Sequence, residues 1–138
     1  MQGESQHLHR LSTTVLLVDD DPSHLLLHSK LITHAGFRVV TARVGTKSFS
    51  MPERDSPGLI LLDYKMNTTL TPPEVVSFLR ETFPGVPIVL LSSMLEMPME
   101  MGALVDGFLN KDPERIIDFV RTFFDGGGIA QAATSSSV

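Results

Sequence analysis

Residues 14–23 read TVLLVDDDPS, and this stretch combines an apolar run, an acidic cluster and a helix start. Its first five residues, TVLLV, form a run without polar alternation, which is typical of a strand covered on both faces in a parallel sheet. Three aspartates follow, and Asp21 with Pro22 supplies the cap and first-turn proline of a helix over 23–35 that ends at Gly36. The sequence therefore predicts a buried strand that ends in acidic side chains just before a helix.

The rest of the chain repeats this alternation of apolar runs and helical segments. Further strands are predicted at 37–42, 59–62, 88–91 and 107–109. Two more helices have clear starts, because a capping box opens the segment 71–82 and Asp112 with Pro113 opens the last helix, which reaches residue 124. This pattern predicts an α/β fold in three layers, a doubly wound parallel sheet of five strands with helices on both faces.

Two of the expected helical connections are weak. The segment from Arg43 to Pro57 has room for a turn or two of helix around Thr46 to Met51, and Pro52 then interrupts it. The segment from 93 to 106 is short and contains Pro98. We therefore expect a shortened or irregular fourth helix, or none.

Length and composition limit the function classes. The chain has 138 residues, 42% hydrophobic and 20% charged, which is enough for one domain with a real core. A net charge of -5 without basic runs disfavours direct nucleic-acid binding, and the absence of cysteine excludes disulfides and thiolate chemistry. No apolar run approaches the roughly 20 residues of a membrane span, so no membrane partner is expected and the cytosol is the expected location.

The composition of the two ends sets the expected domain limits. Residues 1–12 show no apolar core of a signal peptide and are expected to be a flexible tail. Residues 126–138 are small and polar, as in a flexible tail or the stub of a linker. The domain is therefore predicted to span 13–125.

Polar side chains follow the apolar runs at the positions where strands should end. They are Asp19 and Asp20, Asp63, Ser92 and Lys111. Functional groups of a doubly wound sheet collect at the carboxyl ends of its strands, so these side chains should converge at one edge. Crowded carboxylates favour a hard divalent cation, Mg²⁺ or Mn²⁺, and the cation with the lysine would offset charge during phosphoryl transfer to Asp63.

Four segments of the chain resemble a known family. They are VLLVDDDPS, GLILLDYKM, PIVLLSS and GFLNKD, which begin at residues 15, 58, 87 and 107. In this order and near this spacing they resemble the receiver domains of two-component response regulators, including the chemotaxis regulators, over residues 14–124. The resemblance implies a flavodoxin-like strand order of 2-1-3-4-5 and signalling by protein contact.

The resemblance also implies a role for each matching position. Asp63 would be the phosphoacceptor, Asp20 a direct Mg²⁺ ligand, and Asp19 a ligand directly or through water. The backbone carbonyl of Lys65 would complete the ligands from the protein. A sensor histidine kinase or a histidine phosphotransfer protein would supply the phosphoryl group, and a downstream protein would receive the signal.

Further positions are implied to stabilise, transmit or reset the phosphorylated state. Ser92 and Lys111 would hold the phosphoryl oxygens, and Phe108, the aromatic switch position, would turn inward. Lys65 and Met94 lie where the family controls access of water, and an ammonium at 65 predicts slow self-dephosphorylation.

The sequence departs from the family pattern at three places. Asn67 to Thr71 replaces the usual proline and Asp-Gly turn, and Phe108 lacks the hydroxyl of the commoner tyrosine. Asp112 stands where proline usually follows the lysine, so the Lys111–Asp112 bond is predicted to be trans.

Two features of the first helix depend on which of its sides faces the sheet. His24 and His28 are four residues apart, a spacing that allows a shared metal. We instead expect them to be structural and partly buried, on an inward face with Leu27 and Leu31. Leu26 points nearly opposite to this inward face. It is either a contact for the phosphodonor or an ordinary surface leucine, and both interpretations stay open.

Two other functions compete with a phosphorylated receiver. The first is a degenerate receiver that docks a partner without phosphorylation, motivated by the altered loop after Asp63 and the short fourth helix. The second is a haloacid-dehalogenase-like phosphatase, because DDDPS also fits that family's opening motif, with Asp19 as nucleophile and Asp21 as general acid. Phosphatases of that family need a further acidic pair after the lysine motif, whereas in this sequence only the last helix follows Lys111.

Overall fold

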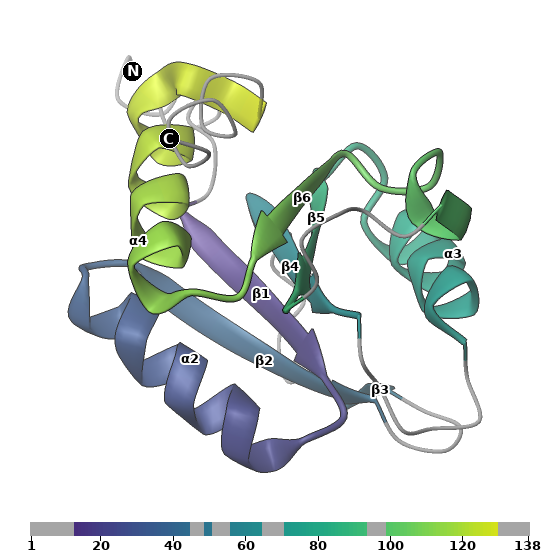
Figure 1. Ribbon diagram of the computed structural model, residues 1–138, viewed down its shortest axis with the longest axis horizontal. Coiled ribbons are helices and arrows are strands. Elements are labelled where there is room, and N and C mark those ends of the chain that lie inside the picture. The colour runs from purple at the N-terminus through teal and green to yellow at the C-terminus, as the bar shows by residue number, and fades with distance from the viewer. Residues whose placement is uncertain (1–12, 45–48, 51–55, 65–70, 94–98, 130–138) are drawn as a thin grey trace, which may run out of the picture.

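A computed structural model of the chain describes residues 13–44, 49–50, 56–64, 71–93 and 99–129. Figure 1 shows one twisted sheet with helices on both sides. The strands are β1 (Thr14–Asp19), β2 (Arg38–Val44), β3 (Phe49–Ser50), β4 (Leu59–Asp63), β5 (Ile88–Ser92) and β6 (Gly107–Asn110). The helices are α2 (Pro22–His34), α3 (Pro72–Thr82) and α4 (Pro113–Thr122), with a 3₁₀ turn η1 (Met99–Met101) and a π-type turn η2 (Phe123–Gly127).

The sheet confirms the predicted fold class and strand order. Its order is β3-β2-β1-β4-β5-β6, and the five long strands are all parallel. Counted without β3, this is the predicted order 2-1-3-4-5. The short β3 is an addition, because its two residues pair antiparallel with the end of β2. The expected helical turn at Thr46 to Met51 is therefore wrong at Phe49–Ser50, where pairing with the free edge of β2 holds the chain extended.

The three predicted helices all begin at the predicted caps. The side chain of Asp21 accepts a hydrogen bond from the Ser23 N–H, and that of Asp112 accepts one from the Arg115 N–H. Thr71 and Glu74 form the reciprocal capping box. In each helix proline occupies the first turn, where its missing N–H costs nothing. The Lys111–Asp112 bond is trans, as no described residue has a cis bond.

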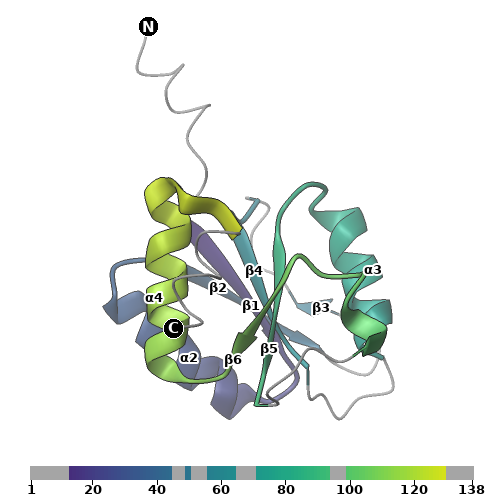
Figure 2. The same ribbon diagram turned by 45° about the horizontal axis from the view of Figure 1, so that its top comes forward.

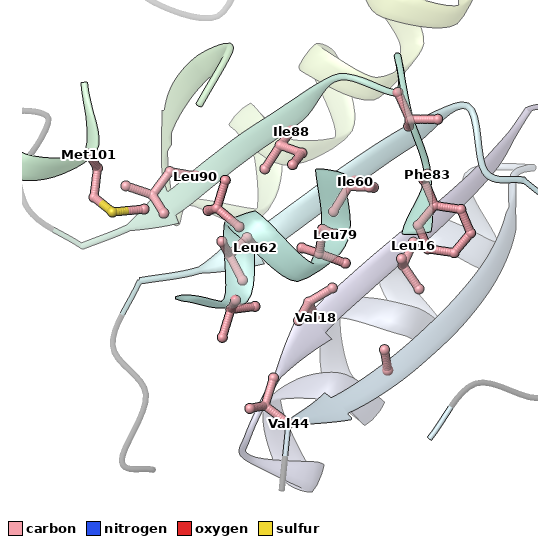
Figure 3. Packing of buried hydrophobic residues seen from close by; sticks show 14 residues of the cluster. Leu16, Val18, Val44, Ile60, Leu62, Leu79, Phe83, Ile88, Leu90 and Met101 are labelled. Atoms are coloured by element: carbon pink, nitrogen blue, oxygen red, sulfur yellow. The ribbon is translucent and has the colours of Figure 1, made fainter. Parts of the chain in front are cut away.

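The sheet separates the core into two halves. Figure 2 shows α2 and α4 on one side of the sheet and α3 on the other. Alternate residues of β1 point to opposite sides, so Val15 and Leu17 face α2 and α4, whereas Leu16 and Val18 face α3. Figure 3 shows the second half, where Leu79 and Phe83 pack over the strands near Leu16 and Ile60. The unbroken apolar runs of the sequence follow from this burial on both faces.

The fourth helical slot is reduced, as predicted. In its described part the chain forms only η1, whose Met101 is fully buried in the half of the core beside α3. Arg80 ties this segment down, since its guanidinium donates to the Leu104 carbonyl at 2.9 Å and to Asp106 Oδ2 at 3.0 Å. The Asp106 carboxylate also accepts the Ile88 N–H at the start of β5.

The orientation of α2 differs from the predicted one. Leu25, His28 and Ile32 form its buried row, so the expectation for His28 is confirmed. Leu27 is 59% exposed and His24 is also exposed, so their predicted inward position is wrong. Leu26 is 59% exposed, as expected. The helix is rotated about its axis relative to the prediction. Its buried row is centred near Ile32, and at about 100° per residue Leu27 lies more than a quarter turn away from that row.

The end of the described chain packs against the core on both sides of the predicted limit of 125. Phe124 stacks on Phe37, and Ile129 packs against the half of the core beside α2 and α4. The tails 1–12 and 130–138 lie outside the described residues. Within the part of the chain that the structure describes, no helix is long and apolar enough to cross a membrane.

Candidate functional site

Asp19 and Asp63 are the last residues of β1 and β4, and the two strands are neighbours. Val18 pairs with Leu62 in the ladder, so the next residues along each strand lie beside each other at the carboxyl edge. Both aspartates are 3% exposed. The Asp21 N–H donates to Asp19 Oδ1 at 3.1 Å, which fixes the first carboxylate from the start of α2. The sheet thus places two buried carboxylates together, as predicted from the strand ends.

Lys111 lies directly after β6 and reaches back to Asp63. Its backbone N–H donates to the Ser92 carbonyl at 2.9 Å, which continues the ladder between β5 and β6. Its Nζ lies 2.6 Å from Asp63 Oδ1, and its side chain is only 19% exposed. A mostly buried ammonium against a buried carboxylate neutralises part of the charge that this edge concentrates.

Neither oxygen of Asp63 accepts a well-aligned hydrogen bond from the described residues. The Lys111 contact is close enough for an ion pair but is not aligned as a hydrogen bond. Buried carboxylate oxygens are normally satisfied by several donors or by a cation. Oxygen donors from Asp19 and Asp63 are the ligands that Mg²⁺ prefers. The donor set therefore fits a hard divalent cation.

The electrostatics of Asp19 point the same way. Burial, and next the negative charge of Asp63, raise the pKa of Asp19 from 3.8 to about 7. Both causes disfavour a second negative charge in a poorly hydrated site. A bound divalent cation would supply the missing counter-charge. Without the cation, the negative charges of Asp19 and Asp63 repel each other.

The remaining residues predicted for chemistry lie around this pair. Asp20 follows β1 and is partly buried, and Ser92 ends β5 with 4% exposure. Asp63 pairs with Leu91, so Ser92 is the next residue along the neighbouring strand. The structure therefore brings Asp19, Asp20, Asp63, Ser92 and Lys111 to one edge, as the sequence predicted.

Of the four other predicted positions, two lie on described elements and two lie outside the described residues. Phe108 lies on β6, partly buried against the half of the core beside α3. Leu26 lies on the outer side of α2. Lys65 and Met94 lie outside the described residues, so their predicted effects on dephosphorylation and the Lys65 carbonyl ligand remain predictions.

Two histidines belong to the surroundings of the site and were not predicted there. His24 Nδ1 lies 3.5 Å from Asp19 Oδ2, and its Nε2 lies 3.7 Å from Asp21 Oδ2. His28 is buried behind the site, and burial, followed by the positive charge of Lys111, lowers its pKa. The available signal was the position of His24 in the first turn of a helix that starts at an acidic strand end.

The comparison with protein families identifies the fold's relatives. The model of the response regulator receiver domain matches residues 15–121. The chain belongs to this family. It is a regulatory family of two-component systems rather than a family of metabolic catalysts, and the predicted resemblance is confirmed.

Relatives and solved structures agree with this assignment. The transcriptional regulatory protein GlrR of Escherichia coli is 29% identical over 104 residues, which are 73% of this chain and 23% of that protein. This chain thus matches about a quarter of that relative's length. The chemotaxis protein CheY4 of Vibrio cholerae is 26% identical with a TM-score of 0.63, over 80% of this chain and 97% of that one.

A third similar protein was solved with ions bound. The response regulator protein TrrA of Thermotoga maritima, in complex with Mg²⁺ and BeF, is 21% identical with a TM-score of 0.55. The match covers 72% of this chain and 86% of that one. At this identity the likeness concerns the fold.

Proposed function

We propose that the chain is a phosphorylated receiver, with Asp63 as the acceptor of a phosphoryl group. One observation carries the proposal: the Asp63 carboxylate is buried beside Asp19, and its Oδ1 lies 2.6 Å from Lys111 Nζ. An acceptor needs an oxygen free of strong hydrogen bonds and a nearby positive charge. The Asp63 environment has both.

The step is a transfer between two covalent partners. A carboxylate oxygen of Asp63 forms a bond to phosphorus while the bond from phosphorus to the donor's histidine nitrogen breaks, and the released imidazole takes up a proton. Lys111 offsets negative charge on the acceptor and on the transferred oxygens. The Ser92 hydroxyl, at the end of the next strand, would donate to a phosphoryl oxygen.

Mg²⁺ or Mn²⁺ is the proposed cofactor, held by Asp19, Asp20 and Asp63 with the Lys65 carbonyl. When bound, the cation supplies positive charge against the phosphoryl oxygens. The buried unsatisfied oxygens of Asp63 and the raised pKa of Asp19 support this assignment. Receivers as a family bind Mg²⁺ in an acidic pocket.

The proposed phosphodonor is a histidine kinase or a histidine phosphotransfer protein that docks on α2. Leu26 and Leu27 are both 59% exposed on this helix, one turn beyond its start at the site. Between α2 and α4 lies a shallow groove of about 340 Å³, lined by Leu31, Ile117 and Arg121 among others. An apolar patch with a charged margin suits a helical partner.

Transmission of the signal is proposed to use Phe108 and Ser92. Phe108 is only partly buried, so its ring has room to move when Ser92 closes on a phosphoryl group. The downstream partner would then be a protein, and the proposed location is the cytosol. Slow self-dephosphorylation remains the expectation for the ammonium at Lys65.

Phosphorylation is tested with a small phosphodonor and Mg²⁺, followed by intact mass and amide NMR. The wild-type chain should gain one phosphoryl group, and Asp63→Asn should gain none. Asp118→Asn, a substitution of an exposed carboxylate on α4, is the matched control and should react like wild type.

The same experiment separates the competing functions. No adduct, and no NMR shift with beryllofluoride, would favour a docking module that is not phosphorylated. Steady phosphate release that survives Asp63→Asn but is lost in Asp19→Asn would favour the phosphatase. Against the phosphatase, Asp21 already caps α2 through the Ser23 N–H, at 2.8 Å, instead of facing a substrate as a general acid.

A further inference from the structure

His24 is the one imidazole among the described residues that faces the carboxylates of the site directly. It occupies the first turn of α2, and its side chain is 46% exposed. One ligand atom from each of Asp19, His24 and Asp63 lies within 4.8 Å of the other two. The structure groups His24 with these two carboxylates, and the sequence alone had paired it with His28.

We propose that Asp19, His24 and Asp63 form a binding site for a divalent first-row transition-metal ion, such as Zn²⁺ or Co²⁺, that competes with Mg²⁺. The proposal that this metal binds holds whether or not Asp63 is phosphorylated. Its effect on phosphorylation rests on the proposed function of Asp63.

The separation of the donor atoms fits such an ion. Zinc binds imidazole nitrogen and carboxylate oxygen at about 2.0 to 2.2 Å, so two ligands of a tetrahedral site lie roughly 3.3 to 3.5 Å apart. His24 Nδ1 and Asp19 Oδ2 are 3.5 Å apart. The third donor, on Asp63, lies within 4.8 Å of the other two, and the His24 side chain is 46% exposed.

Asp63 provides an independent indication that this site takes a ligand. It is 97% buried, counted from an exposure of 3%, and both of its oxygens lack a hydrogen-bond donor among the described residues. Lys111 approaches Oδ1 alone. A buried carboxylate whose oxygens lack an aligned hydrogen bond, next to an imidazole, offers a pair of metal ligands.

The His24 imidazole determines for which metals the site has higher affinity. Mg²⁺ prefers oxygen ligands and keeps several waters, so a nearby histidine nitrogen adds little to its binding. Zinc, cobalt and nickel bind imidazole readily and generally bind mixed nitrogen and oxygen sites more tightly than Mg²⁺. His24 therefore should raise transition-metal affinity while leaving Mg²⁺ affinity nearly unchanged.

Occupation by a transition metal would have a regulatory consequence. The ion would use an Asp63 oxygen and Asp19 as ligands, and the same groups are needed for Mg²⁺ and for the phosphoryl group. A transition metal should therefore lower the fraction of chains that can be phosphorylated. The competition makes the receiver responsive to a second chemical input.

The metals are titrated by calorimetry, and Co²⁺ also by its visible absorption, which reports coordination geometry. All variants are made in a chain with His7→Gln and His9→Gln, so that histidines of the N-terminal segment do not contribute. The test variant is His24→Gln. The matched control is His34→Gln, an exposed histidine in the last turn of the same helix.

The expected result is selective loss. His24→Gln should weaken Co²⁺ and Zn²⁺ binding about 10- to 100-fold and change Mg²⁺ binding by less than about twofold. His34→Gln should leave all three affinities unchanged. Asp63→Asn should weaken both classes of metal. Amide NMR spectra of the metal-free variants check that each is folded.

Two results would overturn the proposal. Equal Co²⁺ affinity in the background chain and in His24→Gln would remove the imidazole from the site, and Co²⁺ binding that persists in Asp63→Asn would place it elsewhere. Failure of the proposed phosphorylation is a separate outcome, since it appears as no phosphoryl adduct with Mg²⁺ while Co²⁺ binding through His24 survives.

Discussion

The two faces of the sheet differ in how firmly they are covered. The face toward α2 and α4 is closed by two helices, and Phe119, Ile116 and Val120 of α4 are almost completely buried against it. The opposite face is covered, in the described part of the chain, by α3 and the single turn η1. We call the side covered by α2 and α4 the firm face, and the side covered by α3 and η1 the thin face. The firm face is a well-packed support for the site, and the thin face is the side where we expect conformational change.

The site residues are held mainly from the firm face. Asp19 accepts the backbone N–H of Asp21, the N-cap of α2, and Lys111 directly precedes the cap of α4. Phe108, which is expected to transmit a signal, packs on the other face. On that side Tyr64, next to the acceptor, also bonds to Glu100 of η1. A receiver needs both properties, a constant site and a bistable output.

The largest expected effect is on the firm face. Phe119→Ala should lower the free energy of unfolding by about 3 to 5 kcal/mol, because a fully buried aromatic ring leaves a cavity. Leu79→Ala, its counterpart on α3, should cost about 2 to 4 kcal/mol. Denaturant unfolding measures both. A greater cost for Leu79→Ala would reverse the comparison of the two faces.

Sequence reasoning predicted the elements and most of the site for one physical reason. Strand ends in a parallel sheet share an edge, so Asp19, Asp63, Ser92 and Lys111 are placed by the order of apolar runs alone. Helix starts are equally local, because caps such as Asp21 and Thr71 act within three residues. Neither inference needs knowledge of packing.

The failures concern information that is not local. The side of α2 that faces the sheet depends on a rotation of the whole helix, and a small error moved His24 and Leu27 inward in the prediction. The pairing of Phe49–Ser50 with β2 depends on a free strand edge rather than on helical propensity. The position of His24 beside Asp19 follows from the same rotation, so it required the structure.

The next effect tests the charge conflict at the firm edge. The pKa of Asp19 is raised from 3.8 to about 7, so without metal the native state binds a proton that the unfolded state releases between about pH 4 and 7. That stabilising contribution is present below pH 4 and lost as pH rises through about 7. Asp19→Asn should therefore be more stable than wild type at pH 8, by about 1 to 3 kcal/mol, in chelator.

Unfolding curves between pH 4 and 8 measure this contribution, with Asp118→Asn as the control for an exposed carboxylate. Mg²⁺ should reduce the advantage of Asp19→Asn, because the cation stabilises only the chain that keeps both carboxylates. Parallel pH profiles for wild type and Asp19→Asn would contradict the buried charge conflict.

The smallest effect concerns the thin face. The Tyr64 hydroxyl donates to Glu100 Oε2 at 2.6 Å, an exposed bond that should contribute little to global stability. Tyr64→Phe removes the bond and should speed amide exchange at Leu104 and Val105, whose N–H groups bond to the Met101 carbonyl, by about two- to fivefold. Exchange at Phe83, bonded within α3, should not change. Unchanged exchange at 104 and 105 would mean that Arg80 and buried Met101 are enough to hold η1 in place. Tyr64, the residue after the acceptor, would then not stabilise the thin face.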